Sequence, residues 1–237
     1  MLDVDDKEFL DHLAAENTYS DAYFEPRADT IETLYSEIKS RVQESDISTP
    51  VRNGAWWYVA RTQEGLSYPV HHRGPTIDTA TEVVLFDENI ESAGHEYFDL
   101  GALDASHDHR LFAWSIDTAG DERYHMRIRA FADDGTFIDS DEGIDGVANA
   151  GTAWSTDGSS LFYVRPDDQE RPFQVWRHSV GDLTTDADEL IFEELDERFF
   201  VAIGETRSNE WIIIHTASKT SAEVRLAPSD LSAPFTI

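Results

Sequence analysis

The hydrophobic and polar positions follow two different periods along the chain, and the change falls near Pro50. Before it, apolar residues recur every three to four positions, which is typical of amphipathic helices. Asp5 or Asp6 is expected to cap the first helix by accepting hydrogen bonds from its free amides, and Glu8 completes a capping box after Asp5. This helix is predicted to end near Tyr19. Its apolar face comprises Phe9, Leu10, Leu13 and Ala14.

A second helix is predicted after Pro26, because apolar residues again recur with helical spacing. They are Ile31, Leu34, Tyr35, Ile38 and Val42. Two helices of this size cannot enclose a core between their apolar faces. We therefore expect the amino-terminal helical segment, residues 1–49, to pack against the rest of the chain.

After Pro50, short runs of β-branched and aromatic residues alternate with turns rich in Gly, Asp, Ser and Pro, which predicts strands. A polar turn led by Ser106, Ser155 or Thr206 precedes a strand at three places, and these turns are 49 and 51 residues apart. Asn53 and Gly54 supply a fourth turn one period upstream. The predicted strands include residues 55–60, 82–86, 111–114, 126–129, 161–164, 174–177 and 211–214.

Four short strands in about fifty residues are typical of one blade of a β-propeller. The predicted fold class is therefore mainly β: a partial β-propeller of about three to four blades, each of four antiparallel strands, in residues 50–237, preceded by the two helices. A β-sandwich is the alternative, but a sandwich does not require a constant period. Comparable inner positions of the blades are predicted for Trp57, Leu111, Leu161 and Ile212.

The number of repeats predicts an incomplete ring. Propellers close with roughly four to eight blades, and fewer than four complete copies fit after Pro50. Residues 234–237 resemble the start of another strand, for which no partner follows.

Composition and charge limit the possible partners. The chain has 18 Lys and Arg against 48 Asp and Glu, a formal net charge of −30. Nucleic acid and anionic membranes require clustered basic residues, so we expect neither as a partner. The hydrophobic fraction of 40% is too high for a disordered chain. Disulfides and thiolate chemistry are excluded because the sequence has no cysteine. The acidic start lacks the features of a secretory signal, and we expect a cytoplasmic protein.

The sequence lacks a recognisable nucleophile. A serine hydrolase of the α/β type places its serine in a G-x-S-x-G turn. Gly158, Ser159 and Ser160 come nearest, but they lack the second glycine and the following helix, so a blade turn is predicted there. No catalytic residue is therefore predicted within the chain.

The histidines are weak candidates for metal binding. His71 and His72 are adjacent in a predicted strand, so their side chains point to opposite faces and cannot chelate one ion. His107 and His109 lie in a loop and are expected to be surface residues. We predict no metal site and no cofactor.

The remaining candidates also have simple structural explanations. His178 and His215 follow apolar strands and are expected to mark strand ends, because no nucleophile is paired with either. The acidic turns lack the ligand spacing of a calcium loop and are expected to be solvated blade loops. These turns are residues 133–135, 139–142, 167–168 and 186–189.

Several segments carry a further signal: residues 13–19, 56–58 with 61–65, 97–101, 173–178, 196–201 and 218–226. In order and spacing they resemble the amino-terminal half of oligopeptidase B, a serine peptidase of the prolyl oligopeptidase family. The resemblance covers nearly the whole chain and agrees with the repeat found independently. Family members usually have more chain before the first helix, so the chain is expected to be clipped at both ends.

The resemblance implies a seven-bladed propeller that covers an α/β-hydrolase domain and excludes folded proteins from its active site. It implies cleavage of short peptides after Arg or Lys, by a triad that belongs to the hydrolase domain. That domain is expected to lie beyond Ile237, so the chain is expected to be inactive alone. Its expected partners are short basic peptides and the hydrolase domain.

Two other functions remain open. The chain could be a free-standing propeller fragment that binds a protein or a peptide. A complete enzyme with an unrecognised site is the least favoured hypothesis, because no set of nucleophile, base and acid can be assembled from the sequence.

Overall fold

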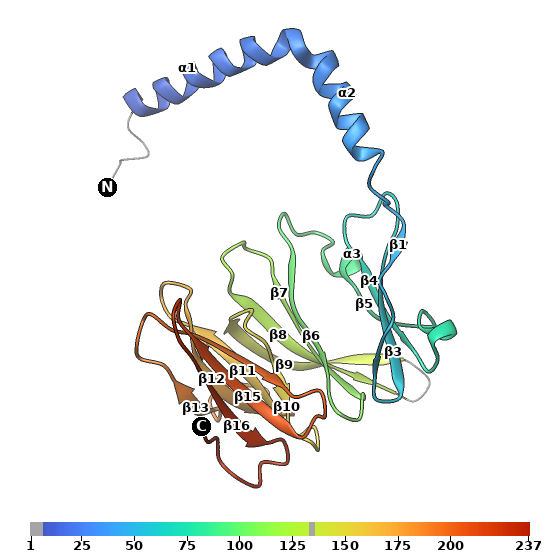
Figure 1. Cartoon of the computed structure of the whole chain (residues 1–237), viewed down its shortest axis with the longest axis vertical. Helices are drawn as coiled ribbons and strands as arrows, with labels where there is room; N and C mark the ends of the chain where they lie inside the picture. The colour runs from blue at the N-terminus through green and yellow to red at the C-terminus, as the bar shows by residue number, and fades with distance from the viewer. Residues whose placement is uncertain (1–6, 133–135) are drawn as a thin grey trace.

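The structure, a computed structural model, describes residues 7–132 and 136–237. It begins with two helices, α1 (Lys7–Phe24) and α2 (Ala28–Lys39), joined by the 3-10 helix η1 (Glu25–Arg27). They form an arm that projects away from the β-structure (Figure 1). Helix α1 continues beyond Tyr19, where it was predicted to end, and the predicted capping residues 5 and 6 lie outside the described residues. Of the described helices, none combines the length and the apolar character that crossing a bilayer requires.

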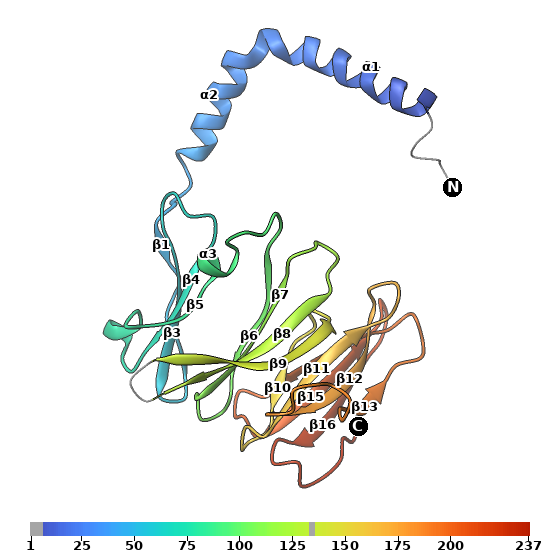
Figure 2. The ribbon, with the colours of Figure 1, turned by 180° about the vertical axis from the view of Figure 1, so that it is seen from behind.

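The prediction that these helices pack against the rest of the chain is wrong. Neither helix has a buried residue, and Leu34 and Ile38 on the apolar face of α2 are 53% and 64% exposed. Two opposite views show the arm meeting the blades only through its connection to the first strand (Figures 1 and 2). Amphipathic spacing predicts the helix and its apolar face correctly, but it does not specify which surface covers that face.

The rest of the described chain forms four antiparallel sheets, which we number as blades 1 to 4. Blade 1 consists of β1 (Asp46–Ile47), β2 (Val51–Asn53), β3 (Trp56–Thr62), β4 (Val70–Gly74) and β5 (Val83–Asp87), with the short helices η2 (Ile77–Thr79) and α3 (Glu88–Glu91). Blade 2 consists of β6 (Asp99–Ala105), β7 (Leu111–Asp117), β8 (Tyr124–Phe131) and β9 (Phe137–Val147). Blade 3 consists of β10 (Ala153–Trp154), β11 (Ser160–Pro166), β12 (Pro172–Ser179) and β13 (Glu189–Glu193), and blade 4 of β14 (Phe200–Glu205), β15 (Trp211–Ala217) and β16 (Ala222–Pro228).

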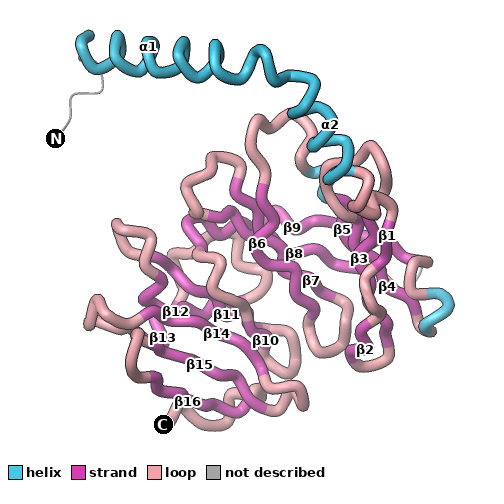
Figure 3. Tube along the Cα trace, turned by 45° about the horizontal axis from the view of Figure 1, so that its top comes forward, coloured by secondary structure: helices cyan, strands magenta, loops and turns pink. Residues whose placement is uncertain are grey.

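The strands of each blade are hydrogen-bonded in sequence order, as β6-β7-β8-β9 and β10-β11-β12-β13 show. In blade 1 both β1 and β2 pair with β3, and blade 4 has three strands. The blades stand side by side around a common centre (Figure 3). The predicted fold, a partial propeller of three to four blades preceded by two helices, is therefore confirmed, and the β-sandwich is excluded.

The core lies between the blades, face against face. Phe86 of blade 1 meets Phe112 and Trp114 of blade 2 in one apolar cluster. Further clusters join blade 2 to blade 3 and blade 3 to blade 4. Each sheet is thus buried by its neighbours, which explains why single blades have no core of their own.

The predicted repeat corresponds to one turn built three times between the first and second strands of blades 2 to 4. The amides of Ser106, Ser155 and Thr206 each donate to the carbonyl five residues later, at 2.9 Å. The fourth residue of each turn has a positive φ of 58°, 70° or 59°. These are His109, Gly158 and Asn209.

Two of the four predicted inner positions, Leu111 and Trp57, are not fully buried, and superposing the turns identifies the correct residue of blade 2. Leu161 and Ile212 lie six residues after the first turn residue, and both are fully buried. The corresponding residue of blade 2 is Phe112, which is 2% exposed, whereas Leu111 lies on the opposite face of β7 and is half-buried. Trp57 of blade 1 is also only half-buried. The error at Leu111 arises because a shift of one residue moves a side chain to the other face of a strand.

The carboxyl-terminal segment finds a partner within the chain. Residues 234–237 were predicted to begin an unpartnered strand, but Thr236 forms an antiparallel bridge with Leu226 of β16. The ring of Phe235 packs edge-on against Phe162, with centroids 6.2 Å apart. The segment therefore covers part of the edge of blade 4.

We expect Gly151→Ala to destabilise the fold by about 2–5 kcal/mol, as the sum of backbone strain and overpacking. Gly151 connects blades 2 and 3 with a φ of +91°, and an added Cβ would lie 2.0 Å from the carbonyl oxygen of Ile203. Gly94 is the matched control because it has the same φ of +91° with no atom within 4 Å of an added Cβ. Gly94→Ala should cost only about 1–2 kcal/mol. Equal losses in urea unfolding would show that the contact with Ile203 does not matter.

Candidate functional site

The inner edges of the four blades, formed in blade 1 by β2, converge at the centre of the molecule. A cavity of about 640 Å³ is lined by residues from β2, β6, the start of blade 3 and β14. Its polar wall includes Asn53, Asp104, Thr152 and Glu205, which we call the channel wall, and Arg52 and Arg207 also line this cavity. Residues from distant parts of the sequence meet here because each blade contributes its innermost strand.

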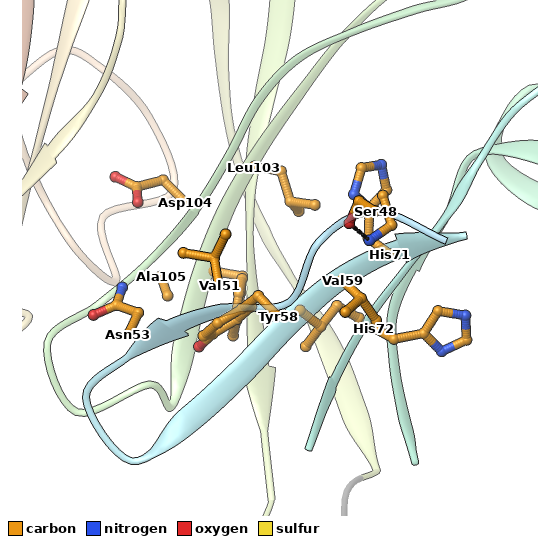
Figure 4. Close-up of a pocket in the computed structure, with 13 residues that line it drawn as sticks. Ser48, Val51, Asn53, Tyr58, Val59, His71, His72, Leu103, Asp104 and Ala105 are labelled. Atoms are coloured by element: carbon orange, nitrogen blue, oxygen red, sulfur yellow. Dashed lines mark hydrogen bonds between the residues drawn. The ribbon is translucent and has the colours of Figure 1, made fainter. Parts of the chain in front are cut away.

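A second cavity, of about 350 Å³, lies between blades 1 and 2 (Figure 4). It shares Val51, Asn53, Asp104 and Ala105 with the larger cavity. Its remaining wall is largely apolar and includes Leu85, Leu103 and Phe112. The close-up shows Asp104 on the opposite side of this space from His71 and His72 (Figure 4). The two cavities thus form a joined space with a carboxylate at the junction.

Asp104 is the most perturbed carboxyl group of the channel wall. Burial, reinforced by the charge of Glu205, raises its pKa from 3.8 to about 6. The hydroxyl of Thr152 donates a hydrogen bond of 3.0 Å to Asp104 Oδ2, but this does not offset the burial. No Lys or Arg within the described residues forms an ion pair with Asp104.

Glu205 links three blades. Its side chain accepts a hydrogen bond from the backbone amide of Trp154 in blade 3. His107, in the first turn of blade 2, lies with Nε2 2.6 Å from Glu205 Oε2. Glu205 itself ends β14 of blade 4. The Glu205 carboxylate is therefore held in place by contacts to both of its oxygens, whereas one side-chain hydrogen bond, from Thr152, reaches Asp104 among the described residues.

The four histidines considered as metal ligands do not form a common site. They are His71, His72, His107 and His109. His71 Nε2 contacts Glu88 at 2.7 Å, whereas His72 points elsewhere and burial lowers its pKa. His107 pairs with Glu205, and His109 Nδ1 contacts the hydroxyl of Tyr58 at 2.6 Å. His109 is 6% exposed and the side chain of His107 is 11% exposed, so the prediction that these are surface residues is wrong. Within the described ranges no three His, Asp or Glu side chains are arranged so that they could hold a metal ion.

His178 and His215, which were expected to mark strand ends, also differ from that expectation. His215 lies within β15 instead of at its end. His178 is the penultimate residue of β12, but it is buried and contacts two carboxylates, Asp188 and Glu142. Sequence reasoning missed this cluster because its members come from different blades.

The turn predicted at Gly158–Ser160 is confirmed. Asp157 accepts hydrogen bonds from the hydroxyls of Ser155 and Ser159, both at 2.7 Å, in the connection between β10 and β11. The hydroxyl and amide of Ser159, together with Ser155, lower the pKa of Asp157 to about 2. Ser159 therefore supports a turn and is not paired with a base.

The predicted acidic loops prove to be of several kinds. Residues 139–142 lie within β9, where Asp139 pairs with Arg129, so this segment is not a loop. Asp167 organises the turn between β11 and β12 by binding Arg171 at 2.9 Å. Asp188 is buried against His178. The predicted loop at 133–135 lies outside the described residues.

One protein family matches the helices and the blades together. The profile of the family described as prolyl oligopeptidase, N-terminal beta-propeller domain, matches residues 1–236. The chain belongs to this family. The family assignment agrees with the arrangement of blades and with the resemblance seen in the sequence.

The relatives of this prolyl oligopeptidase propeller are peptidases of greater length. Dipeptidyl aminopeptidase BI of Pseudoxanthomonas mexicana is 35% identical over 98% of the chain and 34% of the relative. Protease 2 of Moraxella lacunata is 29% identical over 96% of the chain and 33% of the relative. The chain thus spans about a third of the length of these proteins.

Solved structures of the same family show the same arrangement. Oligopeptidase B from Leishmania major matches with a TM-score of 0.81 and 27% identity, over 97% of the chain and 32% of the solved chain. Oligopeptidase B from Trypanosoma brucei, with covalently bound antipain, also gives 0.81, with 29% identity over 96% and 32%.

The channel wall was not predicted from the sequence, although the repeat contained a signal. The position before the turn is Ala105 in blade 2, Trp154 in blade 3 and Glu205 in blade 4. A carboxylate where the other blades have an apolar residue marks a departure from the repeat. Asp104, which precedes Ala105, could not be found in this way. Its raised pKa results from burial in the folded chain and leaves no mark in the repeat.

Proposed function

We propose that this chain is the substrate-gating propeller portion of an oligopeptidase-B-like serine endopeptidase, which acts in the cytoplasm on short peptides and cleaves after Arg or Lys. The observation that carries the proposal is the carboxylate pair of Asp104 and Glu205 where the blades converge. A cationic peptide side chain can pair with these carboxylates, and the two arginines of the same cavity, Arg52 and Arg207, form no ion pair with them among the described residues. The membership in the prolyl oligopeptidase family supports the peptidase part of the proposal.

The dimensions of the central space support selection by size. The cavities of about 640 and 350 Å³ are in the range of small-molecule and short-peptide sites. A folded protein cannot enter a space of this size, whereas an extended peptide of a few residues can. The net charge of −30 adds a long-range attraction for basic peptides, which salt weakens.

The chemistry of cleavage is assigned in this proposal to an α/β-hydrolase domain that acts with the chain. In the described residues five histidine rings contact a carboxylate or a tyrosine, and no histidine ring is hydrogen-bonded to a serine hydroxyl. A serine nucleophile needs an adjacent base. The propeller therefore contributes substrate selection, and the triad comes from the partner domain.

The proposal predicts that the 237-residue chain alone does not hydrolyse a fluorogenic peptide with Arg before the scissile bond. A serine-directed phosphonate should leave it unlabelled, since positioned nucleophile and base are what such reagents need. The chain expressed in one reading frame with its hydrolase domain should cleave the Arg peptide and show little activity on the same peptide with Gln. Stoichiometric labelling with turnover by the chain alone would contradict the division of roles.

A binding module is the second candidate, and the exposed apolar face of α2 favours it. Ile31, Leu34, Tyr35 and Ile38 are all between 46% and 64% exposed. Exposed apolar surfaces of this kind are typical of association sites. Light scattering over a salt series separates the two candidates: a chain that stays monomeric and cooperatively folded at high salt favours the free-standing module, and self-association favours the peptidase portion.

A further inference from the structure

His178 is a buried titratable residue that has no part in the proposed function. It lies on β12 of blade 3, and its side chain is 1% exposed. Its Nδ1 is 2.8 Å from Asp188 Oδ1, and its Nε2 is 3.2 Å from Glu142 Oε2. Glu142 belongs to β9 of blade 2. The imidazole ring therefore bridges two blades.

The geometry requires a particular protonation state. Carboxylate oxygens only accept hydrogen bonds, and a neutral imidazole can donate from one nitrogen only. Both ring nitrogens of His178 face such oxygens, so the imidazolium alone satisfies both contacts. The side chains of Asp188 and Glu142 are 1% and 4% exposed, so water does not replace a lost contact.

The contacts with Asp188 and Glu142 are the main determinant of the charge of His178, as its other neighbours show. Asp188 Oδ2 accepts a hydrogen bond of 2.7 Å from the Tyr163 hydroxyl on β11, and Glu142 Oε2 accepts one of 2.8 Å from the amide of Gly181. Arg165 stacks on the ring of Tyr163, 5.4 Å from its centroid. The charged groups that face His178 are thus two carboxylates.

We propose that His178 is a pH-sensitive clamp, which as an imidazolium holds blades 2 and 3 together and which loosens this joint when it loses its proton in alkaline solution. The same joint carries the hydrogen bond between Thr152 and Asp104, at the channel wall. Loosening the clamp therefore reaches the central cavity. The inference does not depend on the nature of the substrate.

The direction of the pH effect follows from the environment of the ring. Burial alone lowers the pKa of His178, but the hydrogen bonds and charges of Glu142 and Asp188 outweigh it and raise the pKa above the ordinary 6.5. At pH values between 6.5 and the raised pKa of the folded state, folding is therefore accompanied by the uptake of a proton by His178. The contribution of the clamp to stability is complete below pH 6.5 and is lost as the pH rises through the pKa of the folded state.

The direct test is ¹⁵N NMR of the histidine rings in the 237-residue chain across a pH series. At pH 7 both ring nitrogens of His178 should carry protons. A single protonated nitrogen at pH 7 would overturn the proposal, whatever any variant does.

Thermal unfolding provides the second test. The midpoint of the unmodified chain should fall by about 3 °C or more between pH 7 and pH 9. In Glu142→Gln this fall should begin at lower pH, because one of the two anions is removed and the amide can donate to a neutral ring. In His178→Gln the fall should be absent.

The matched control is His125→Gln. His125 on β8 also contacts a carboxylate, Asp145 Oδ1, at 2.6 Å, but its side chain is 44% exposed. This variant should keep the alkaline fall of the unmodified chain. An alkaline fall that persists in His178→Gln, or that disappears in His125→Gln, would contradict the clamp.

Discussion

Replacement of Arg129 by alanine is expected to destabilise the chain by about 3–5 kcal/mol, the cost of breaking a buried ion pair by removing one partner. The Arg129 side chain is 3% exposed in β8 of blade 2. It binds Asp139 at 2.6 Å, Glu91 at 3.1 Å and the carbonyl oxygen of Leu85 at 2.9 Å. Leu85 and Glu91 belong to blade 1 or follow it directly, so one side chain ties two blades together.

The loss should exceed the effect of an ordinary surface arginine for a second reason. The guanidinium stacks on three aromatic rings, 3.9 Å from the centroid of Phe137, 5.4 Å from Phe86 and 5.6 Å from Trp114. Buried cation–π contacts contribute about 2 kcal/mol or more when desolvated. Alanine removes these contacts and also leaves a cavity.

Arg127→Ala is the control, because Arg127 lies two residues earlier on the same strand and has fewer contacts: one hydrogen bond of 2.7 Å to the carbonyl of Ser140 and one cation–π contact, 5.7 Å from the centroid of Trp114. It should cost about 1 kcal/mol. Urea unfolding followed by tryptophan fluorescence measures both variants, since Trp114 reports on the joint between blades 1 and 2. Equal costs would show that the ion pairs of Arg129 contribute little to the joint.

Arg129 also shows what the sequence could predict and what it could not. The strand that carries it, residues 126–129, was predicted from local pattern, and the period of the turns led to the correct blade architecture. The partners could not be predicted, because Asp139 faces Arg129 only through the register of β8 with β9, and Glu91 reaches it only through the packing of blade 1 on blade 2. Residues 139–142 were accordingly assigned to a solvated loop, although they form part of β9.

The same distinction applies to the arm and to the channel wall. Helical periodicity predicted the apolar face of α2, but periodicity is local and does not identify a covering surface. Asp104 and Glu205 lie 101 positions apart in the sequence and meet only because the inner edges of the blades converge. Local turn chemistry, by contrast, was predicted well: Ser155 and Asp157 form their turn with neighbours in the sequence.

Asp104→Asn is expected to stabilise the chain at pH 8 by up to about 3 kcal/mol. Burial raises the pKa of Asp104 from 3.8 to about 6, and a rise of this size corresponds to about 3 kcal/mol between the two protonation states. The charged form is disfavoured in the folded chain, so stability falls as the pH rises from about 3.8 through 6. Asparagine has no charge to bury, and its oxygen can still accept the hydrogen bond of Thr152. The gain should therefore disappear below about pH 4.

Asp157→Asn is the matched control because its effect has the opposite sign. The hydrogen bonds of the turn lower the pKa of Asp157 to about 2, so its charge contributes stability at pH 8 that is lost as the pH falls through this value. Asp157→Asn should therefore destabilise the chain at pH 8. Urea unfolding at pH 4 and pH 8 compares the two variants, and a loss of stability in Asp104→Asn at pH 8 would show that its carboxylate is held by favourable contacts.

A stabilising Asp104→Asn would also bear on function, because residues that reduce stability are concentrated at binding and catalytic sites. In the proposed enzyme, which would join this chain to a hydrolase domain, we expect the same variant to raise KM for an Arg peptide about tenfold and to leave kcat nearly unchanged. A tenfold change corresponds to about 1.4 kcal/mol, the size expected for one lost charge-assisted contact. KM for the matched Gln peptide should not change. A variant that is more stable and still binds both peptides as before would remove Asp104 from the proposed gate while leaving the family assignment intact.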